Sequence, residues 1–122
     1  TNTAQYYIKE NSTSWGNYGN SGFEINSTKA RGYANPWKEV SETSKSAGTE
    51  ILLTTGASEQ NKKMNIYDFA GNLNEWTLEK NNTSYPCSSR GGFCYYDWPA
   101  SYRNTDGTTN IYLIIGLRPA LY

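Results

Sequence analysis

Histidine is absent from the 122 residues of this chain, valine occurs once, and no apolar run approaches the length of a membrane-spanning helix. Without His, the chain lacks the usual general base near neutral pH and the commonest nitrogen ligand of metals. It also lacks an excess of either charge, because eleven Lys and Arg balance eleven Asp and Glu. We therefore expect no nucleic-acid partner and no membrane insertion, which takes about 20 apolar residues in one helix.

Aromatic residues are what the chain has in quantity. Only 36% of the residues are hydrophobic, yet 15% are aromatic, with four Trp, eleven Tyr and three Phe. Each aromatic side chain buries about 150–250 Å², so these residues can fill a small core with little aliphatic help. Much of the remainder is Asn, Ser, Thr and Gly, which are typical of turns. We expect one folded, loop-rich domain over residues 1–122.

The local pattern predicts short strands and loops. Residues 1–36 alternate short aromatic stretches with Gly, Asn and Ser and show no helical repeat. Residues 38–50 are polar and are predicted to be a loop, with a short helical turn as the alternative. The compact apolar run over 51–56, which Gly56 closes, predicts a strand or a short buried segment, and residues 111–115 predict a buried strand.

Two cysteines, Cys87 and Cys94, flank the Arg90-Gly91-Gly92 turn. A disulfide across a hairpin and two free thiols are both open at this point. A zinc site is not expected, because the chain has neither His nor a second pair of Cys.

Three segments of the chain resemble blocks of the formylglycine-generating-enzyme family: residues 65–77, Arg90-Gly91-Gly92 and residues 116–122. Their order and spacing match as well, over about residues 51–122. The resemblance implies an α+β, C-type-lectin-like fold with short twisted antiparallel strands, few helices and much irregular loop. Residues 14–18 are similar to upstream segments of bacterial and phage members. Helical elements that precede them in the family are missing, so we expect a domain that lacks its N-terminal helical part.

The departures from the family concern the catalytic residues. The enzymes bind copper through two cysteines that lie five residues apart, downstream of the Arg-Gly-Gly turn. Cys94 is near the first of those positions, but the second falls around Pro99, and Cys87 lies on the other side of the turn. We therefore expect a protein that is not an enzyme, because a fold carries no activity without its site. The alternatives are an oxidase relative of the formylglycine-generating type, or a structural decoration of a phage tail or cell surface.

A second branch of the family, the variable proteins of diversity-generating retroelements, resembles the chain more closely. Its fixed frame is similar to residues 90–92, 99–101, Arg103 and 115–119, with substituted positions between them. Adenine mutation of an AAC codon cannot produce Lys, Glu, Gln, Met or Trp, and residues 93–115 contain none of the first four. Trp98 is an exception, which requires a different codon. The resemblance implies an adhesin or phage receptor-binding head, on a virion or bacterial surface, with diversified loops. A homo-oligomer is compatible with it.

Five aromatic residues fall within positions 93–102. Tyr and Trp provide large, stiff contact areas at a low entropy cost, which suits a ligand-binding surface. The alternative is that they fill the core, but a strand with a side-chain period of two cannot bury all of residues 93–96. The candidate residues for binding a protein or glycan ligand are Phe93, Tyr95, Tyr96, Asp97, Trp98, Tyr102, Asn104, Asp106 and Tyr112.

In the family that the chain resembles, the block around residues 68–75 holds a structural calcium ion. Carried over, its ligands are the side chains of Asp68 and Glu75 and the carbonyls of Gly71 and Leu73, which are the hard oxygen donors that Ca²⁺ prefers. The alternative is that the two carboxylates accept backbone N–H groups of a turn without metal. Trp76 is expected in the core, and Arg118 is expected to pair with a buried carboxylate, for which Glu75 is a candidate.

Overall fold

The computed structural model describes residues 2–34, 38–107 and 115–118. These residues form a mixed α+β structure of short strands and loops with few helices, as expected. The helical elements are α1 (Asn2–Lys9), η1 (Thr13–Trp15) and η2 (Glu59–Asn61). The strands are β1 (Gly16–Asn17), β2 (Phe23–Glu24), β3 (Gly32–Ala34), β4 (Lys38–Val40), β5 (Ser44–Lys45), β6 (Ile51–Leu53), β7 (Lys62–Lys63), β8 (Ile66–Tyr67), β9 (Ala70–Gly71), β10 (Asn74–Trp76), β11 (Cys87–Arg90), β12 (Asn104–Asp106) and β13 (Ile115–Gly116).

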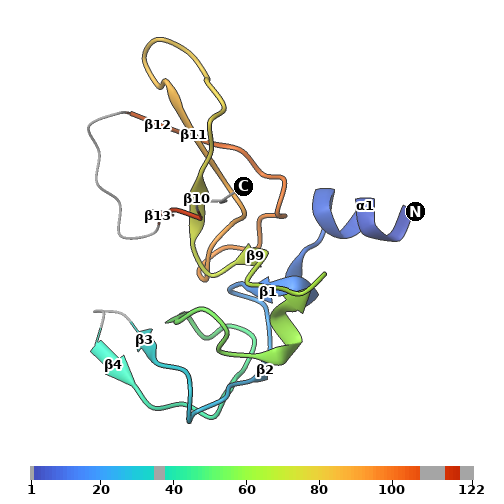
Figure 1. The fold of residues 1–122 in the computed structure, drawn as a ribbon, viewed down its shortest axis with the longest axis vertical. Helices are drawn as coiled ribbons and strands as arrows, with labels where there is room; N and C mark the ends of the chain where they lie inside the picture. The colour runs from blue at the N-terminus through green and yellow to red at the C-terminus, as the bar shows by residue number, and fades with distance from the viewer. Residues whose placement is uncertain (1, 35–37, 108–114, 119–122) are drawn as a thin grey trace.

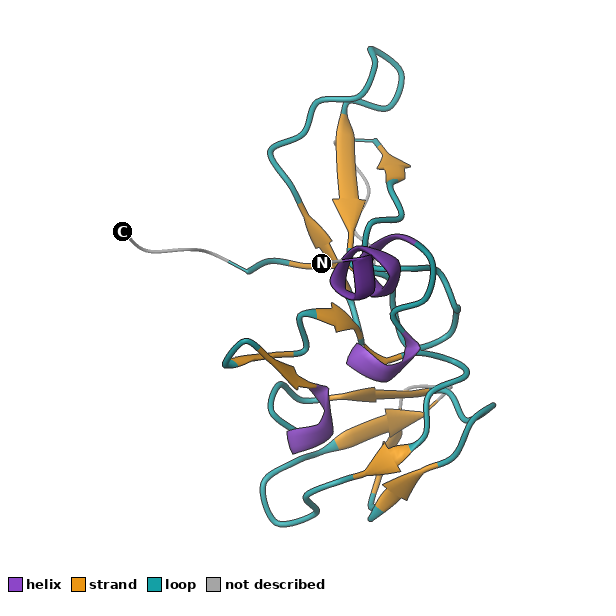
Figure 2. Ribbon diagram, turned by 90° about the vertical axis from the view of Figure 1, so that its right-hand side faces the viewer, coloured by secondary structure: helices purple, strands orange, loops and turns teal. Residues whose placement is uncertain are grey.

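The strands are arranged in two lobes (Figure 1). The upper lobe contains a four-stranded sheet of order β12-β11-β10-β13, and the lower lobe contains the sheet β4-β3-β6 and the pair β2-β5. The parallel pair β1-β9 lies between the lobes, and Figure 2 shows the same elongated arrangement from the side. Most strand pairs are antiparallel, as expected, but β10 and β13 are also parallel.

Helix α1 contradicts the prediction of strands and loops over residues 1–36. Eight residues are too few to display a helical repeat, and so short a helix is stable only through tertiary contacts. Tyr7 provides such a contact, because its ring lies 5.6 Å from that of Trp15, which in turn lies 6.1 Å from the ring of Phe69. The Ser12 hydroxyl, which donates to the Tyr7 carbonyl, then fixes the end of the helix.

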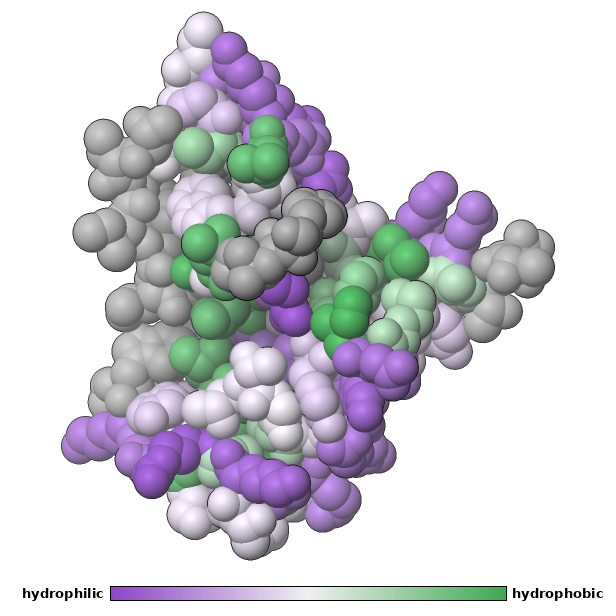
Figure 3. Space-filling view, in the orientation of Figure 1, coloured by the Kyte–Doolittle hydropathy of each residue, from purple (hydrophilic) through white to green (hydrophobic). Residues whose placement is uncertain are grey.

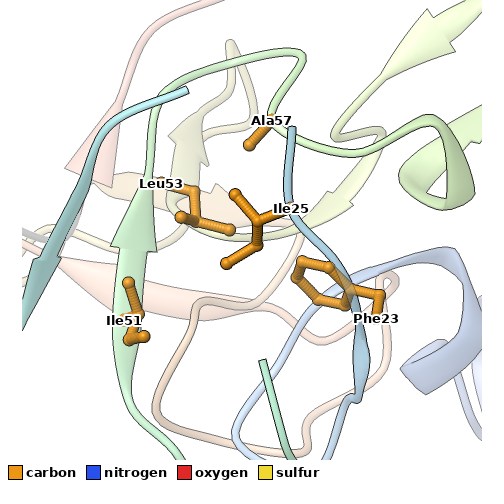
Figure 4. Packing of buried hydrophobic residues seen from close by; sticks show 5 residues of the cluster. All are labelled: Phe23, Ile25, Ile51, Leu53 and Ala57. Atoms are coloured by element: carbon orange, nitrogen blue, oxygen red, sulfur yellow. The ribbon is translucent and has the colours of Figure 1, made fainter. Parts of the chain in front are cut away.

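The lower lobe encloses the main hydrophobic core. Phe23 and Ile25 pack against Ile51 and Leu53, with Ala57 beside them (Figure 4). The predicted strand at 51–56 is confirmed over Ile51–Leu53. This core is largely aliphatic although the chain has few aliphatic residues, so the aromatic residues carry less of it than their number suggests.

The predicted loop at 38–50 is wrong in two places, where β4 and β5 form. Their polar residues mark no strand in the sequence because β4 is an edge strand that pairs only with β3, and β5 pairs only with β2. In β5, Lys45 is only 3% exposed, and its amine donates to the carbonyls of Tyr18, at 2.6 Å, and Ser21, at 2.9 Å. These two bonds compensate the burial of the amine.

The predicted buried strand at 111–115 lies outside the described residues except for Ile115. This residue opens β13 and is half-buried, and Gly116 lies opposite Glu75 of β10. Trp76 of β10 is half-buried instead of lying in the core. It lines a groove of about 360 Å³ together with Ile8 of α1 and Phe69. On the face in Figure 3, apolar residues gather in the middle, between the lobes and beside α1.

Two buried side-chain amides join the β1-β9 pair to β6. Asn17 donates to the Ile51 carbonyl at 2.7 Å and to the Asn72 side-chain oxygen at 2.9 Å. Asn72 accepts from the Leu53 N–H at 2.9 Å and donates to the Leu53 carbonyl at 2.7 Å. The edge of β6 that faces away from β3 is therefore closed by side chains, where another strand would otherwise be needed.

Glycine makes the close approach of β1 and β9 possible. A Cβ atom on Gly16 would lie 1.6 Å from the Ala70 carbonyl oxygen, so no other residue fits there without moving the backbone. Asn72 follows this pair with a φ of 66°, a left-handed conformation that Asn tolerates better than most residues. Backbone geometry and side-chain hydrogen bonds thus both favour Asn at position 72.

We predict that Asn72→Ala lowers the free energy of unfolding by about 3–5 kcal/mol, because it leaves buried backbone groups of Leu53 unpaired, at about 1–3 kcal/mol each, and adds left-handed strain. Urea unfolding measures the loss. Asn65→Ala is the matched control, since Asn65 has a similar φ of 63° but lies exposed in the β7-β8 turn. Equal losses in the two variants would contradict a role for the amide. If Asn72→Ala does not fold, Asn72→Gly removes the same bonds without the strain.

Candidate ligand-binding surface

Three of the predicted ligand-binding residues form a continuous stack, which we call the aromatic ridge: Tyr96, Trp98 and Tyr102. The rings of Tyr96 and Trp98 lie 4.5 Å apart at 28°, and those of Trp98 and Tyr102 lie 4.3 Å apart at 27°. Tyr96 is 48% exposed and Tyr102 39% exposed, while Trp98 between them is half-buried. The ridge therefore presents large aromatic groups to solvent, already ordered against one another.

Phe93 supports the ridge from below. It is only 4% exposed and meets the Tyr96 ring edge-on, with the ring centroids 4.9 Å apart. The Phe93 ring is therefore used in packing in this structure, and its contact with a ligand stays a prediction. The expectation that residues 93–96 are not all buried holds, since Tyr95 is half-buried and Tyr96 is exposed.

The turn that precedes the ridge is fixed by Tyr18. The buried Tyr18 hydroxyl donates to the Gly91 carbonyl at 2.8 Å, and burial raises the pKa of this phenol. Gly92 has a φ of 74°, and a Cβ atom there would lie 2.6 Å from the Tyr18 ring and 2.9 Å from the Trp98 carbonyl oxygen. Position 92 therefore requires glycine for both its conformation and its lack of a side chain.

An ion cluster holds the far end of the ridge. Glu79 accepts from the guanidinium groups of both Arg90, at 2.9 Å, and Arg103, at 3.0 Å. Arg90 also donates to the Ser101 carbonyl, next to Tyr102 in the chain. The cluster ties the loop after β10 to the segment that carries the ridge.

Asp97 connects the ridge to the lower lobe. Its carboxylate accepts from the Asn20 N–H at 3.0 Å, and the buried Lys45 amine holds the same turn through the carbonyls of Tyr18 and Ser21. Beside it is a shallow depression of about 280 Å³. Its lining residues are Gly19, Asn20, Ala47, Gly48, Glu50, Tyr95 and Asp97. Sequence reasoning missed Asn20 and Glu50, which carry no motif and are distant from Asp97 along the chain.

The remaining predicted ligand residues lie elsewhere. Asn104 and Asp106 belong to β12, opposite Ser89 and Cys87 of β11. Tyr112 lies outside the described residues. The described part of this segment thus supports the sheet that carries the ridge.

The two cysteines are free: Cys94 is buried and Cys87 half-buried. Burial raises the pKa of the Cys94 thiol to about 12. Since the thiolate is the nucleophile and metal ligand, this environment disfavours both functions at neutral pH.

The four predicted calcium ligands line one cavity of about 100 Å³: Asp68, Gly71, Leu73 and Glu75. The Arg118 guanidinium lines it too, and it donates to Glu75 at 2.7 Å and to the Asp68 carbonyl at 2.7 Å. The expected Arg118–Glu75 pair is therefore confirmed, although Glu75 is half-buried and not buried as expected. The Gly71 carbonyl accepts the Leu73 N–H at 2.9 Å.

Asp68 accepts from the Gly56 N–H at 3.1 Å, as the metal-free alternative expects. Within the described ranges, no cluster of three or more His, Cys, Asp or Glu side chains is placed to hold a metal ion. Arg118 thus places a positive charge beside the four predicted ligands. Calcium binding stays a prediction.

No protein-family model, curated protein or solved structure matches this chain. Among the helices that the structure describes, none is long and apolar enough to cross a membrane. The function must therefore be argued from the surface itself.

We predict that Asp68→Asn stabilises the protein at neutral pH. Burial raises the pKa of the Asp68 carboxyl, with smaller opposing effects from the Gly56 N–H and Arg118. A carboxyl with a raised pKa stabilises the fold below its unfolded pKa of about 3.9 and loses this contribution as pH rises through its folded pKa. The side-chain amide of the variant keeps an acceptor for the Gly56 N–H without the charge.

Urea unfolding at pH 7 and pH 3 measures this effect. The free energy of unfolding of the variant should exceed that of the native chain at pH 7, with the difference shrinking at pH 3. Glu42→Gln, at an exposed carboxylate, is the control and should change little. A calcium ion held by ionised Asp68 gives the opposite sign, so a loss of stability at pH 7 that appears only with added Ca²⁺ would establish the metal site.

Proposed function

We propose that this protein is a non-catalytic ligand-binding domain whose binding face is the aromatic ridge, flanked by Asp97. The observation that carries the proposal is the stack of Tyr96, Trp98 and Tyr102, exposed in part and fixed at both ends. Aromatic groups that are ordered before binding give large contact areas at a low entropy cost. Such residues dominate the energetics of many protein interfaces.

The support beneath the ridge favours recognition over chemistry. Tyr18, Phe93 and the Arg90–Glu79–Arg103 cluster all hold the ridge in place. The Cys94 thiol, which follows Phe93 in the chain, is buried with a raised pKa, which disfavours oxidation chemistry at this surface. By its resemblance to variable proteins, the domain serves as an adhesin or receptor-binding head on a phage virion or bacterial surface, with a protein or glycan ligand.

Removal of the exposed ridge tyrosines tests the proposal. Ligands are first selected on the native chain. We predict that the double variant Tyr96→Ser/Tyr102→Ser binds them with an affinity at least about tenfold lower, or about 1.4 kcal/mol, because both rings contact the ligand. Ligands come from a displayed random-peptide library and a glycan array. Tyr6→Ser/Tyr85→Ser is the control, since these tyrosines are 51% and 54% exposed elsewhere. Equal losses in both double variants, or no selected ligand at all, would count against the ridge.

The buried and exposed positions also support a diversified face. Gly92 and Phe93 are constrained by packing, whereas Tyr96, Asp97 and Tyr102 are exposed over this fixed support. A mechanism that rewrites codons must spare the first group to keep the fold, and it can alter the second freely. The arrangement is thus compatible with the retroelement branch that the sequence resembles.

Comparison of the encoding locus among isolates checks the diversification. We predict that amino-acid substitutions concentrate at positions 95–98 and 102, while Arg90, Gly92 and Phe93 stay unchanged because packing fixes them. The exposed positions 27–29 serve as the control, since they lie on the surface outside the ridge. Similar variability in the two exposed sets would indicate ordinary surface drift and a face of fixed specificity.

A further inference from the structure

The shallow depression beside the ridge has two carboxylate residues and Tyr95 in its lining. Glu50 and Asp97 enter it from different parts of the chain, and both are exposed. Tyr95 belongs to the same lining, and Tyr96, its neighbour in the chain, begins the ridge. The depression is therefore continuous with the proposed binding face.

The carboxylate of Asp97 is held in place before any ligand binds. One of its oxygens accepts the Asn20 N–H at 3.0 Å, and Asn20 belongs to the turn that Lys45 fixes. A carboxylate that is already oriented loses little freedom when it pairs with a cation. Glu50 adds a second negative charge at the same depression.

Lys45 is a basic residue close to this depression, but it is not part of the lining. Its amine is buried, donates to two backbone carbonyls and lies 5.9 Å from the centre of the Phe23 ring. Of the three charges, two negative and one positive, only the negative ones line the depression. The surface is thus complementary to a cationic group.

The dimensions indicate one side chain. Small-molecule sites usually enclose about 300–1,000 Å³, and this open depression has about 280 Å³. Of the two basic side chains, arginine suits it better, because its planar guanidinium pairs with carboxylates through a fork of N–H groups and stacks on aromatic rings. Lysine offers only a compact, strongly hydrated charge.

We propose that this depression receives an arginine side chain of a protein ligand whose neighbouring residues lie along the aromatic ridge. The inference rests on the proposed function and adds the class of partner: a protein segment with an exposed arginine beside apolar residues. Charge complementarity sets the position of the arginine, and the ridge provides the apolar contact area.

Nuclear magnetic resonance of the ¹⁵N-labelled chain tests the depression directly, with N-acetyl-arginine-N-methylamide as the probe. We expect saturable shifts of the amide signals of Gly19, Gly48 and Asp97. N-acetyl-citrulline-N-methylamide, which has the same shape without the charge, is the matched control. It should bind at least about threefold more weakly, because one hydrogen bond between charged groups usually contributes more than this to affinity. The lysine analogue should also bind more weakly than arginine.

Variants of the chain complete the test. Glu50→Gln and Asp97→Asn should each weaken arginine binding by about three- to tenfold, because each removes a charge-assisted hydrogen bond. The amide introduced by Asp97→Asn keeps an acceptor for the Asn20 N–H, so the turn stays in place. Glu24→Gln, at an exposed carboxylate on β2, should bind the probe like the native chain.

Equal shifts with arginine and citrulline, equal binding of lysine, or shifts confined to other amides would each overturn the inference. Peptides selected through the ridge that keep their affinity when arginine is replaced by citrulline would refute the arginine site while leaving the proposed function intact. Loss of binding in the ridge variant is measured separately, so the two failures are distinguishable.

Discussion

The two lobes depend on one buried interaction, the pair of side-chain amides of Asn17 and Asn72. These amides bond the backbone of Ile51 and Leu53 and each other, so they connect β1 and β9 to the edge of β6. An unpaired backbone group in the interior costs about 1–3 kcal/mol, and strands of two or three residues provide few ladder bonds of their own. A chain of such short strands needs side chains to take the place of missing strand partners.

The same principle positions the candidate site. Buried polar groups fix irregular loops at defined points: the Tyr18 hydroxyl on Gly91, the Lys45 amine on Tyr18 and Ser21, and Asp97 on Asn20. Loops held in this way can carry exposed aromatic residues in a stable arrangement. In the proposed function, a ligand would meet a surface that is already ordered, which lowers the entropy cost of binding.

The sequence predicted those features that depend on nearby residues or on a recognisable motif. The apolar run at 51–53 predicted β6, the run of aromatic residues at 93–102 indicated an exposed surface, and Glu75 was the candidate partner of Arg118. It failed for α1, which has too few residues to show a repeat, and for β4 and β5, whose polar composition resembles a loop. Phe93 was assigned to the ligand as a member of the aromatic run at 93–102, although its own ring is buried.

The sequence by itself thus determined the composition of the surface: many aromatic residues, balanced charge, no histidine, and glycines where the backbone turns sharply. Only the tertiary structure decided which aromatic rings stack, which carboxylates share a depression, and which asparagines are buried. Glu50 and Asp97, like Asn17 and Asn72, are far apart along the chain. Their meeting depends on how the lobes pack, and no local pattern records that packing, because long-range contacts are set by the burial and hydrogen bonding of the whole fold.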